Sequence, residues 1–144
     1  MARITLSGAD ELELSLKEIA EIPEDVLDEM LSDGADAAME GHRKSLQSHG
    51  LVRTGTLLRS LKKKKKKGRD GKLYYLISPS GTHHTNKDGS KVRNAEVGSI
   101  NEFGAPRKHI PAKQWMRDGN EQSADKVVRA EFSVYDEYLK SKNL

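Results

Sequence analysis

The stretch that decides the fold is residues 97–117, which read VGSINEFGAPRKHIPAKQWMR. It holds one of the two phenylalanines, the only tryptophan and two of the four prolines of the chain. Gly104 can adopt positive φ at the end of a short element, and Pro106 and Pro111 favour extended geometry in the residues before them. This pattern predicts a short helix or strand–helix junction, a fixed loop, and a new helix that begins at Trp115. A plain surface loop does not need a tryptophan, so we expect this loop to pack or dock.

The region before this stretch carries the clearest strand, residues 72–78, which is rich in aromatic and β-branched side chains. Asp70-Gly71 is a favourable hairpin turn, so residues 62–68 are the predicted partner strand despite their six lysines. Residues 79–93 have no hydrophobic periodicity and contain many turn-forming residues. We expect them to form a mobile loop or the tip of a long hairpin, with Asp88-Gly89 as a candidate turn.

Two long helices are predicted on either side of the strands. Pro23 marks the start of the first, because proline suits the first helical position and acidic residues suit the first turns. His49-Gly50 marks its end. Gly34 and Gly41 within it permit close approach of another helix, with a local kink as the alternative. The second helix is predicted from Trp115 to about Lys140, where spaced apolar residues give it one semi-apolar face.

Shorter elements complete the prediction. Residues 1–8 alternate polar and apolar side chains and are predicted to form a strand or arm, and residues 10–20 a helix, with a continued strand as the alternative. Thr54 is predicted to cap a single-turn helix whose apolar residues lie at 57–61. The tail, residues 140–144, is expected to fray.

The composition favours one domain over residues 1–144, of class α+β, with the long N-terminal and C-terminal helices packed on a small antiparallel sheet. Only 35% of the residues are hydrophobic and 33% are charged, which predicts a small core and a large polar surface. The absence of cysteine excludes disulfides and cysteine-based zinc sites. No apolar run approaches the roughly 20 residues that span a bilayer, so no membrane partner is predicted.

Charge is unevenly distributed along the chain. Residues 9–40 contain twelve acidic side chains and one lysine, whereas residues 42–72 are strongly basic. Such separation suggests a polar interaction surface or charge-complementary contacts between neighbouring copies. The acidic helix is interpreted either as a solvated face or as a partner for the basic hairpin of an adjacent copy in a ring.

The lysine run is the strongest feature for nucleic-acid binding, because a row of cations binds phosphate. The alternative interpretation is a solvated strand whose lysines guard its edge and lay their aliphatic stems over core leucines. No helix-turn-helix signature accompanies the run, so we predict at most loose, non-sequence-specific contact with DNA. A small nucleic-acid-binding protein is therefore the alternative function, with candidate phosphate contacts at Lys62, Lys63, Lys64, Lys65, Lys66 and Lys67.

Signatures of catalysis and metal binding are weak. Adjacent histidines in a strand point to opposite faces, and no third ligand stands at suitable spacing from His83-His84. The chain has no Gly-x-Ser-x-Gly elbow and no phosphate-binding loop of the Walker type. We predict that the protein is not an enzyme and needs no cofactor or metal.

Three stretches, taken in order, resemble a known family. They are VRTGTLLRSL at residues 52–61, INEFG at residues 100–104 and IPAKQWMR at residues 110–117. The neck or tail-completion proteins of long-tailed bacteriophages, also called minor tail components, typically show V-R-T-G-x-L-x-x-S, then E-F-G-T, then P-A-R-P-F. The resemblance covers roughly residues 20–140. Departures include Ala105 for threonine, Trp115 for phenylalanine, and Lys113-Gln114 for Arg-Pro.

The resemblance implies a structural virion protein at the head–tail junction, at the top of the tail, assembled in the host cytoplasm. It implies a homo-oligomeric ring of six or twelve copies that docks to tail terminator, stopper or tail tube proteins. It leaves open whether Phe103 and Trp115 belong to the core or anchor a partner. The candidate interface residues are Arg53, Glu102, Phe103, Gly104, Arg107, Pro111, Trp115, Met116 and Arg117.

Overall fold

A computed structural model describes residues 22–143 of the chain. The strand predicted at residues 1–8 and the helix predicted at residues 10–20 lie outside these described residues. The elements, in chain order, are α2 (Glu24–Ser48), α3 (Thr56–Ser60), β1 (Leu61–Lys67), β2 (Leu73–Pro79), β3 (Thr82–Thr85), β4 (Lys91–Arg93), α4 (Asn94–Phe103), the 3₁₀ turn η1 (Pro106–Lys108) and α5 (Trp115–Ser141). The predicted α+β class is confirmed.

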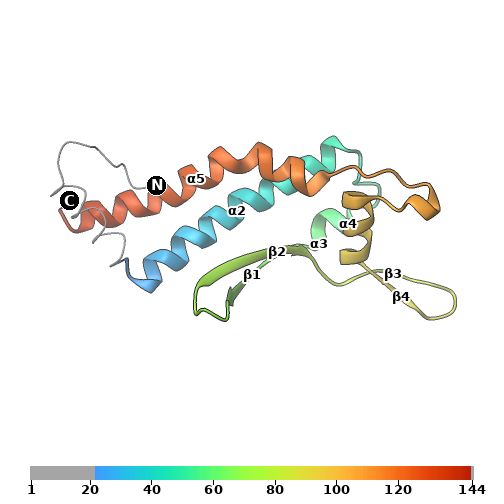
Figure 1. Ribbon diagram of the computed structural model, residues 1–144, viewed down its shortest axis with the longest axis horizontal. Coiled ribbons are helices and arrows are strands. Elements are labelled where there is room, and N and C mark those ends of the chain that lie inside the picture. Colours follow the sequence, from blue (N-terminus) through green and yellow to red (C-terminus); the bar gives the residue numbers. More distant parts are fainter. Residues whose placement is uncertain (1–21, 144) are drawn as a thin grey trace.

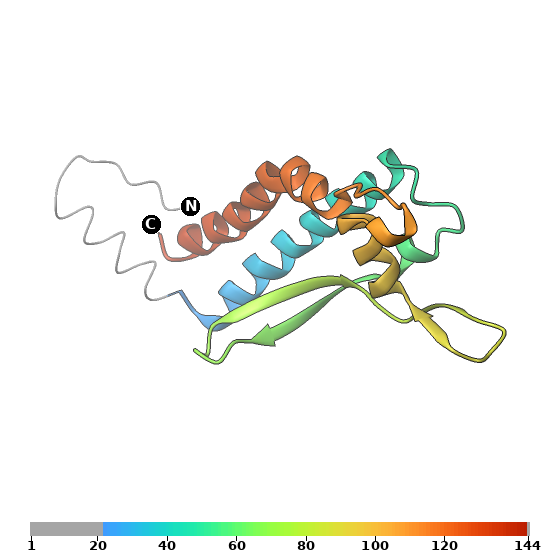
Figure 2. The same ribbon diagram turned by 45° about the vertical axis from the view of Figure 1, so that its right-hand side comes forward.

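Helix α2 is the middle layer of the molecule. Helix α5 packs along one side of it, and the hairpin β1–β2 lies across another side (Figures 1 and 2). The two long helices approach closely at glycines, as the sequence predicted. A Cβ placed on Gly41 would lie 2.5 Å from the Cβ of Ser123, and one on Gly119 would lie 2.6 Å from the ring of His42. Side chains at these positions would push the helices apart.

The hairpin β1–β2 forms where the sequence predicted it. Its strands pair antiparallel, with Lys62 opposite Ser78, Lys64 opposite Leu76 and Lys66 opposite Tyr74. The turn between the strands is closed by a bond from the Gly71 amide to the Gly68 carbonyl. Because side chains alternate along a strand, consecutive lysines of β1 point to opposite faces of the hairpin.

Within residues 79–93, Pro79 ends β2, and residues 82–93 form a second hairpin rather than a loop without regular structure. Strands β3 and β4 pair antiparallel, and both figures show this hairpin extending from the end of the molecule where α3 and α4 lie. The candidate turn at Asp88-Gly89 is confirmed, since Gly89 adopts φ 84° and the Asp88 carboxylate accepts bonds from the Ser90 amide and hydroxyl. Hydrophobic periodicity did not predict these two strands, because they are short and carry few apolar residues.

The predicted helix boundaries hold to within about one residue, except at α3. Pro23 is the residue before α2, and His49 follows its last turn. Helix α3 begins later than predicted, because Gly55 occupies the N-cap in the left-handed region with φ 69°. Thr54 is therefore not the cap, and its hydroxyl oxygen lies 3.4 Å from the Thr56 amide nitrogen. Leu61, predicted as helical, starts β1.

The core lies where the C-terminal half of α2 meets α3, α4 and the start of α5. Its buried centre is Leu46, Leu57, Leu61 and Trp115, and partly buried apolar side chains pack around it. Within residues 22–143, no helix is both long and apolar enough to cross a bilayer. This small core is the platform on which residues 97–117, called the joint from here on, are held.

Candidate functional site

Trp115 is the centre of the joint. Its side chain is fully buried, at 0% exposure, and its Nε1–H donates to the carbonyl oxygen of Gly98 at 2.9 Å. Its own carbonyl accepts a bond from the Ser45 hydroxyl of α2 at 2.6 Å. A buried indole N–H needs a partner, and here the partner fixes the distance between α4 and α5. Trp115 is thus a core residue and offers no surface to a partner.

Glu102 connects α4 to the start of α5. It is 7% exposed, and its carboxylate Oε2 accepts a bond from the Met116 amide at 2.7 Å. Its backbone carbonyl accepts a second bond, from the Gln114 amide at 3.2 Å. The first amides of a helix lack partners inside the helix, and a carboxylate near them suits the helix dipole. Glu102 therefore caps α5 from a neighbouring helix.

The loop between α4 and α5 is closed on itself. Gly104 adopts φ 76°, as predicted, and a Cβ there would lie 2.7 Å from the amide nitrogen of Ala112. Ala105 and Ile110 exchange two backbone hydrogen bonds, of 2.9 and 3.1 Å, around the 3₁₀ turn η1. No larger residue than glycine fits at position 104 without moving this loop.

Phe103 is the residue of the joint whose side chain faces solvent. It is 76% exposed, although the glutamate before it is buried. Ile100, three residues earlier on α4, helps to line an open hollow of about 450 Å³ together with Ala105, Pro106, Arg107 and Lys108. Phe103 is not among the residues that line this hollow; it is a large exposed aromatic side chain at the end of α4, directly before the closed loop.

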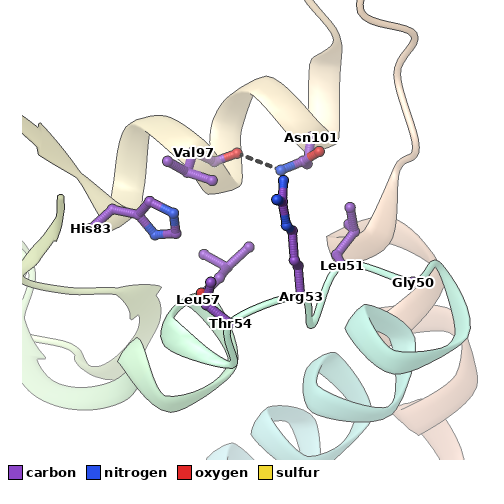
Figure 3. Close-up of a pocket in the computed structure, with 8 residues that line it drawn as sticks. All are labelled: Gly50, Leu51, Arg53, Thr54, Leu57, His83, Val97 and Asn101. Carbon is purple, nitrogen blue, oxygen red and sulfur yellow. Dashed lines mark hydrogen bonds between the residues drawn. The ribbon is translucent and has the colours of Figure 1, made fainter.

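A second groove, of about 360 Å³, lies between the α2–α3 connection and α4. Figure 3 shows the side chain of Arg53 extending across it towards Asn101. The Thr54 hydroxyl donates to the Thr56 hydroxyl, and Nδ1 of His83 is bonded to Oδ1 of Asn94. Among the residues that line the groove, Arg53 is an exposed cation.

Alternate lysines of β1 form ion pairs with α2 of the same chain. Lys63 pairs with Asp36 at 2.8 Å, Lys65 with Asp28 at 2.9 Å and Lys67 with Glu24 at 2.7 Å. The charge pattern of the sequence left open a solvated face or a contact with the hairpin of another copy, and did not predict that part of the acidic helix pairs with the hairpin of its own chain. Three of the six lysines are therefore ion-paired within the chain.

The ion pairs are strengthened by a hydroxyl. Tyr75 donates a short hydrogen bond to Asp28, and this bond, followed by the one from Lys65, holds the pKa of Asp28 below its ordinary value. The bond from Lys67 lowers the pKa of Glu24 in the same way. Carboxylates that accept such bonds stay ionised in the folded state.

The other lysines lie on the outer face of the hairpin. Lys62, Lys64 and Lys66 are exposed and have no ion pair within residues 22–143. Tyr74 and Leu76, on the same face of the hairpin, are 44% and 42% exposed. The six candidate phosphate contacts are thereby reduced to three on one face, which also carries an apolar component.

The two adjacent histidines lie side by side in β3. A bulge in β3 places His83 and His84 with their rings edge to face, 5.4 Å between centroids, rather than on opposite faces as predicted. In the described part of the chain, no group of three histidine, aspartate or glutamate side chains is placed to hold a metal ion.

The predicted interface residues differ in their exposure to solvent. Glu102 and Trp115 are buried, Gly104 and Met116 are partly buried, and the exposed ones are Arg53, Phe103, Arg107, Pro111 and Arg117. Sequence reasoning missed Ser45, Ile100 and the exposed pair Tyr74 and Leu76. The even spacing of Tyr74 and Leu76 along a predicted strand was a signal for the last two.

Comparisons with known protein families, with curated proteins and with solved structures found no match to this chain. The resemblance to phage neck proteins therefore rests on the three stretches themselves. Their geometry is informative on one point: Arg53 and Leu57 from the first stretch line the same groove as Asn101 from the second, and the third begins the helix that Glu102 caps.

Proposed function

We propose that the protein is a structural subunit of the bacteriophage head–tail junction. It acts by packing in a ring and docking to tail terminator, stopper or tail tube proteins. The observation that carries the proposal is the joint: stretches distant in sequence meet around the buried Trp115 and hold Phe103 out towards solvent. The same stretches are the ones that resemble the phage family.

Rigidity of the joint supports a docking role. Phe103 follows directly on Glu102, whose carboxylate and carbonyl are both tied to the start of α5. Gly104, which follows it, is enclosed by the backbone of the loop. A side chain presented from a fixed backbone loses little conformational entropy on binding, which favours affinity. Aromatic anchors of this kind often dominate the energetics of protein interfaces.

The surroundings of Phe103 also suit a protein partner. The hollow between α4 and the loop that follows Phe103 is lined by the apolar residues Ile100, Ala105 and Pro106 together with the basic residues Arg107 and Lys108. An apolar centre surrounded by polar or charged groups is the usual anatomy of a protein interface. We expect the hollow and Phe103 to contribute to one contact between subunits or with a tail protein, in the virion and during assembly in the host cell.

Mass photometry and electron microscopy of the purified chain, alone and mixed with neck and tail proteins of the same phage, test the proposal. We expect a ring of six or twelve copies, or a defined complex with a neck partner. Phe103→Ser should weaken assembly at least tenfold while leaving the fold intact. Phe132→Ser serves as the matched control, since Phe132 is 41% exposed on α5 and lies outside the joint. A chain that stays monomeric in every mixture would overturn the proposal.

A further inference from the structure

We propose that the outer face of the hairpin β1–β2 binds helix α2 of a neighbouring copy. Lys62, Lys64 and Lys66 of one copy then meet a row of carboxylates, Asp25, Glu29 and Asp33, of the next. The inference rests on the proposed ring assembly and assigns a second contact within it, separate from the joint.

The ion pairs between β1 and α2 within one chain show how a lysine strand and an acidic helix fit together. Lys67, Lys65 and Lys63 contact Glu24, Asp28 and Asp36, so the strand runs antiparallel to the helix with its lysines in order. Every second residue of a strand repeats after about 6.8 Å, and every fourth residue of a helix after about 6 Å. Long lysine side chains accommodate this difference: within the chain Lys67 contacts Glu24, Lys65 contacts Asp28, and Lys63 contacts Ser32. Lys63 also reaches Asp36, one further turn along the helix.

The basic row on the outer face repeats the same spacing. Lys62, Lys64 and Lys66 are the alternate residues of β1, and they are exposed without an ion pair in the described residues. Across the hairpin from them lie Leu76 and Tyr74, which are the exposed apolar part of this face. The face therefore offers both charge and apolar area, which an ion-pair row alone would lack.

The acidic row on α2 repeats the spacing of Glu24, Asp28 and Ser32. Asp25, Glu29 and Asp33 follow each other at intervals of four residues, so they lie along one ridge of the helix. All three are exposed, and none has an ion pair within residues 22–143. They sit one position after Glu24, Asp28 and Ser32, which contact Lys67, Lys65 and Lys63 of β1.

The two rows are different surfaces of one molecule. A contact between them is therefore head-to-tail, and contacts of this kind close into rings when the rotation per subunit permits. A nucleic acid is the less favoured occupant, because it would leave the acidic row unpaired. The carboxylates of α2 directly beneath the hairpin also lower the positive potential that attracts phosphate.

Charge reversal tests the contact. The variant K62E/K64E/K66E and the variant D25K/E29K/D33K should each lose at least tenfold in self-association, measured by analytical ultracentrifugation at low ionic strength. An equimolar mixture of the two should associate, because each then supplies the row that the other needs. The six-fold variant with both rows exchanged keeps the formal net charge of the wild type and should regain self-association. K87E/K91E/K126E, which reverses exposed lysines elsewhere, is the control for net charge and should associate like the wild type.

The outcomes separate this contact from the ring itself. Rings that persist in both single-row variants would overturn the contact and leave the proposed ring assembly standing. Failure of the exchanged variant to recover would also overturn the contact, provided that its far-ultraviolet circular dichroism and unfolding midpoint match the wild type. If K62E/K64E/K66E loses binding to a labelled DNA oligonucleotide but self-associates like the wild type, the outer face of the hairpin binds nucleic acid and the inference is wrong.

Discussion

The carboxylate of Glu102, at the end of α4, accepts a hydrogen bond from the backbone amide of Met116 in the first turn of α5, at 2.7 Å. The bond joins two of the three stretches on which the phage resemblance rests. It also explains why a glutamate next to an exposed phenylalanine is itself buried. The glutamate in this stretch is accounted for by the support of α5 rather than by contact with a partner.

Replacing Glu102 should weaken the fold. Glu102→Ala removes the cap of α5 and should lower the free energy of unfolding by about 1–2 kcal/mol, as loss of other helix caps does. Glu102→Gln should cost less, because its amide oxygen still accepts a bond. Urea unfolding followed by circular dichroism measures both. Glu121→Ala, at an exposed site on α5, is the control, and an equal loss there would contradict the capping role.

Trp115 and Phe103 should behave in opposite ways. Trp115→Phe removes the donor to the Gly98 carbonyl and leaves a void, so we expect a loss of about 2–3 kcal/mol in unfolding free energy. Phe103→Ser should change stability by no more than about 0.5 kcal/mol, because the side chain is largely in solvent. Chemical denaturation of the two variants tests this; similar losses would show that Phe103 is part of the core.

The glycines of α2 that face α5 should differ in how well they tolerate substitution by alanine. Gly41→Ala would set a Cβ 2.5 Å from that of Ser123 and 2.9 Å from the Gly119 carbonyl, neither of which can move alone, so we expect a loss of about 2 kcal/mol. At Gly34 the obstacle is the flexible end of Glu131, 2.6 Å away, and alanine favours helix by about 1 kcal/mol. Gly34→Ala should therefore match the wild type in thermal unfolding to within about 1 kcal/mol. Equal destabilisation by both variants would contradict this account.

Asp28 should contribute to stability in a pH-dependent way. Its pKa is lowered in the folded chain, first by the Tyr75 hydroxyl and then by Lys65, so the contribution is present above the unfolded-state pKa of about 4. It is lost as the pH falls through the lower folded-state pKa. Asp28→Asn should be less stable than the wild type at neutral pH, and the difference should shrink below about pH 4. Unfolding midpoints over a pH series measure it; a difference independent of pH would contradict the assignment, and Asp125→Asn, at an exposed site on α5, is the control.

Local chemistry was sufficient to predict much of the fold. Pro23, the Asp70-Gly71 turn and the break before Trp115 gave boundaries that the structure confirms to about one residue. For residues 79–93 the sequence left a mobile loop and the tip of a hairpin open, because the strands β3 and β4 are short and polar, although the turn at Asp88-Gly89 was predicted correctly. The start of α3 was misplaced because a glycine in the left-handed region, rather than threonine, occupies the cap.

The site was harder to predict because its contacts are long-range. Glu102 and Met116 are separated by a loop whose closure no local pattern specifies, so the cap could not be derived. The pairing of Lys65 with Asp28 depends on the register of a strand laid across a helix, which charge patterning alone does not fix. Burial of Trp115 and exposure of Phe103 also depended on how α4 meets α5.

The oligomeric mass of the wild-type chain and of Phe103→Ser, measured side by side by mass photometry, tests the central claim most directly. We predict a wild-type ring of six or twelve copies, alone or with its neck partner, and a folded Phe103→Ser chain that no longer assembles under the same conditions. A wild-type chain that remains a monomer with every neck and tail protein supplied, or a Phe103→Ser ring indistinguishable from the wild type, would contradict the account.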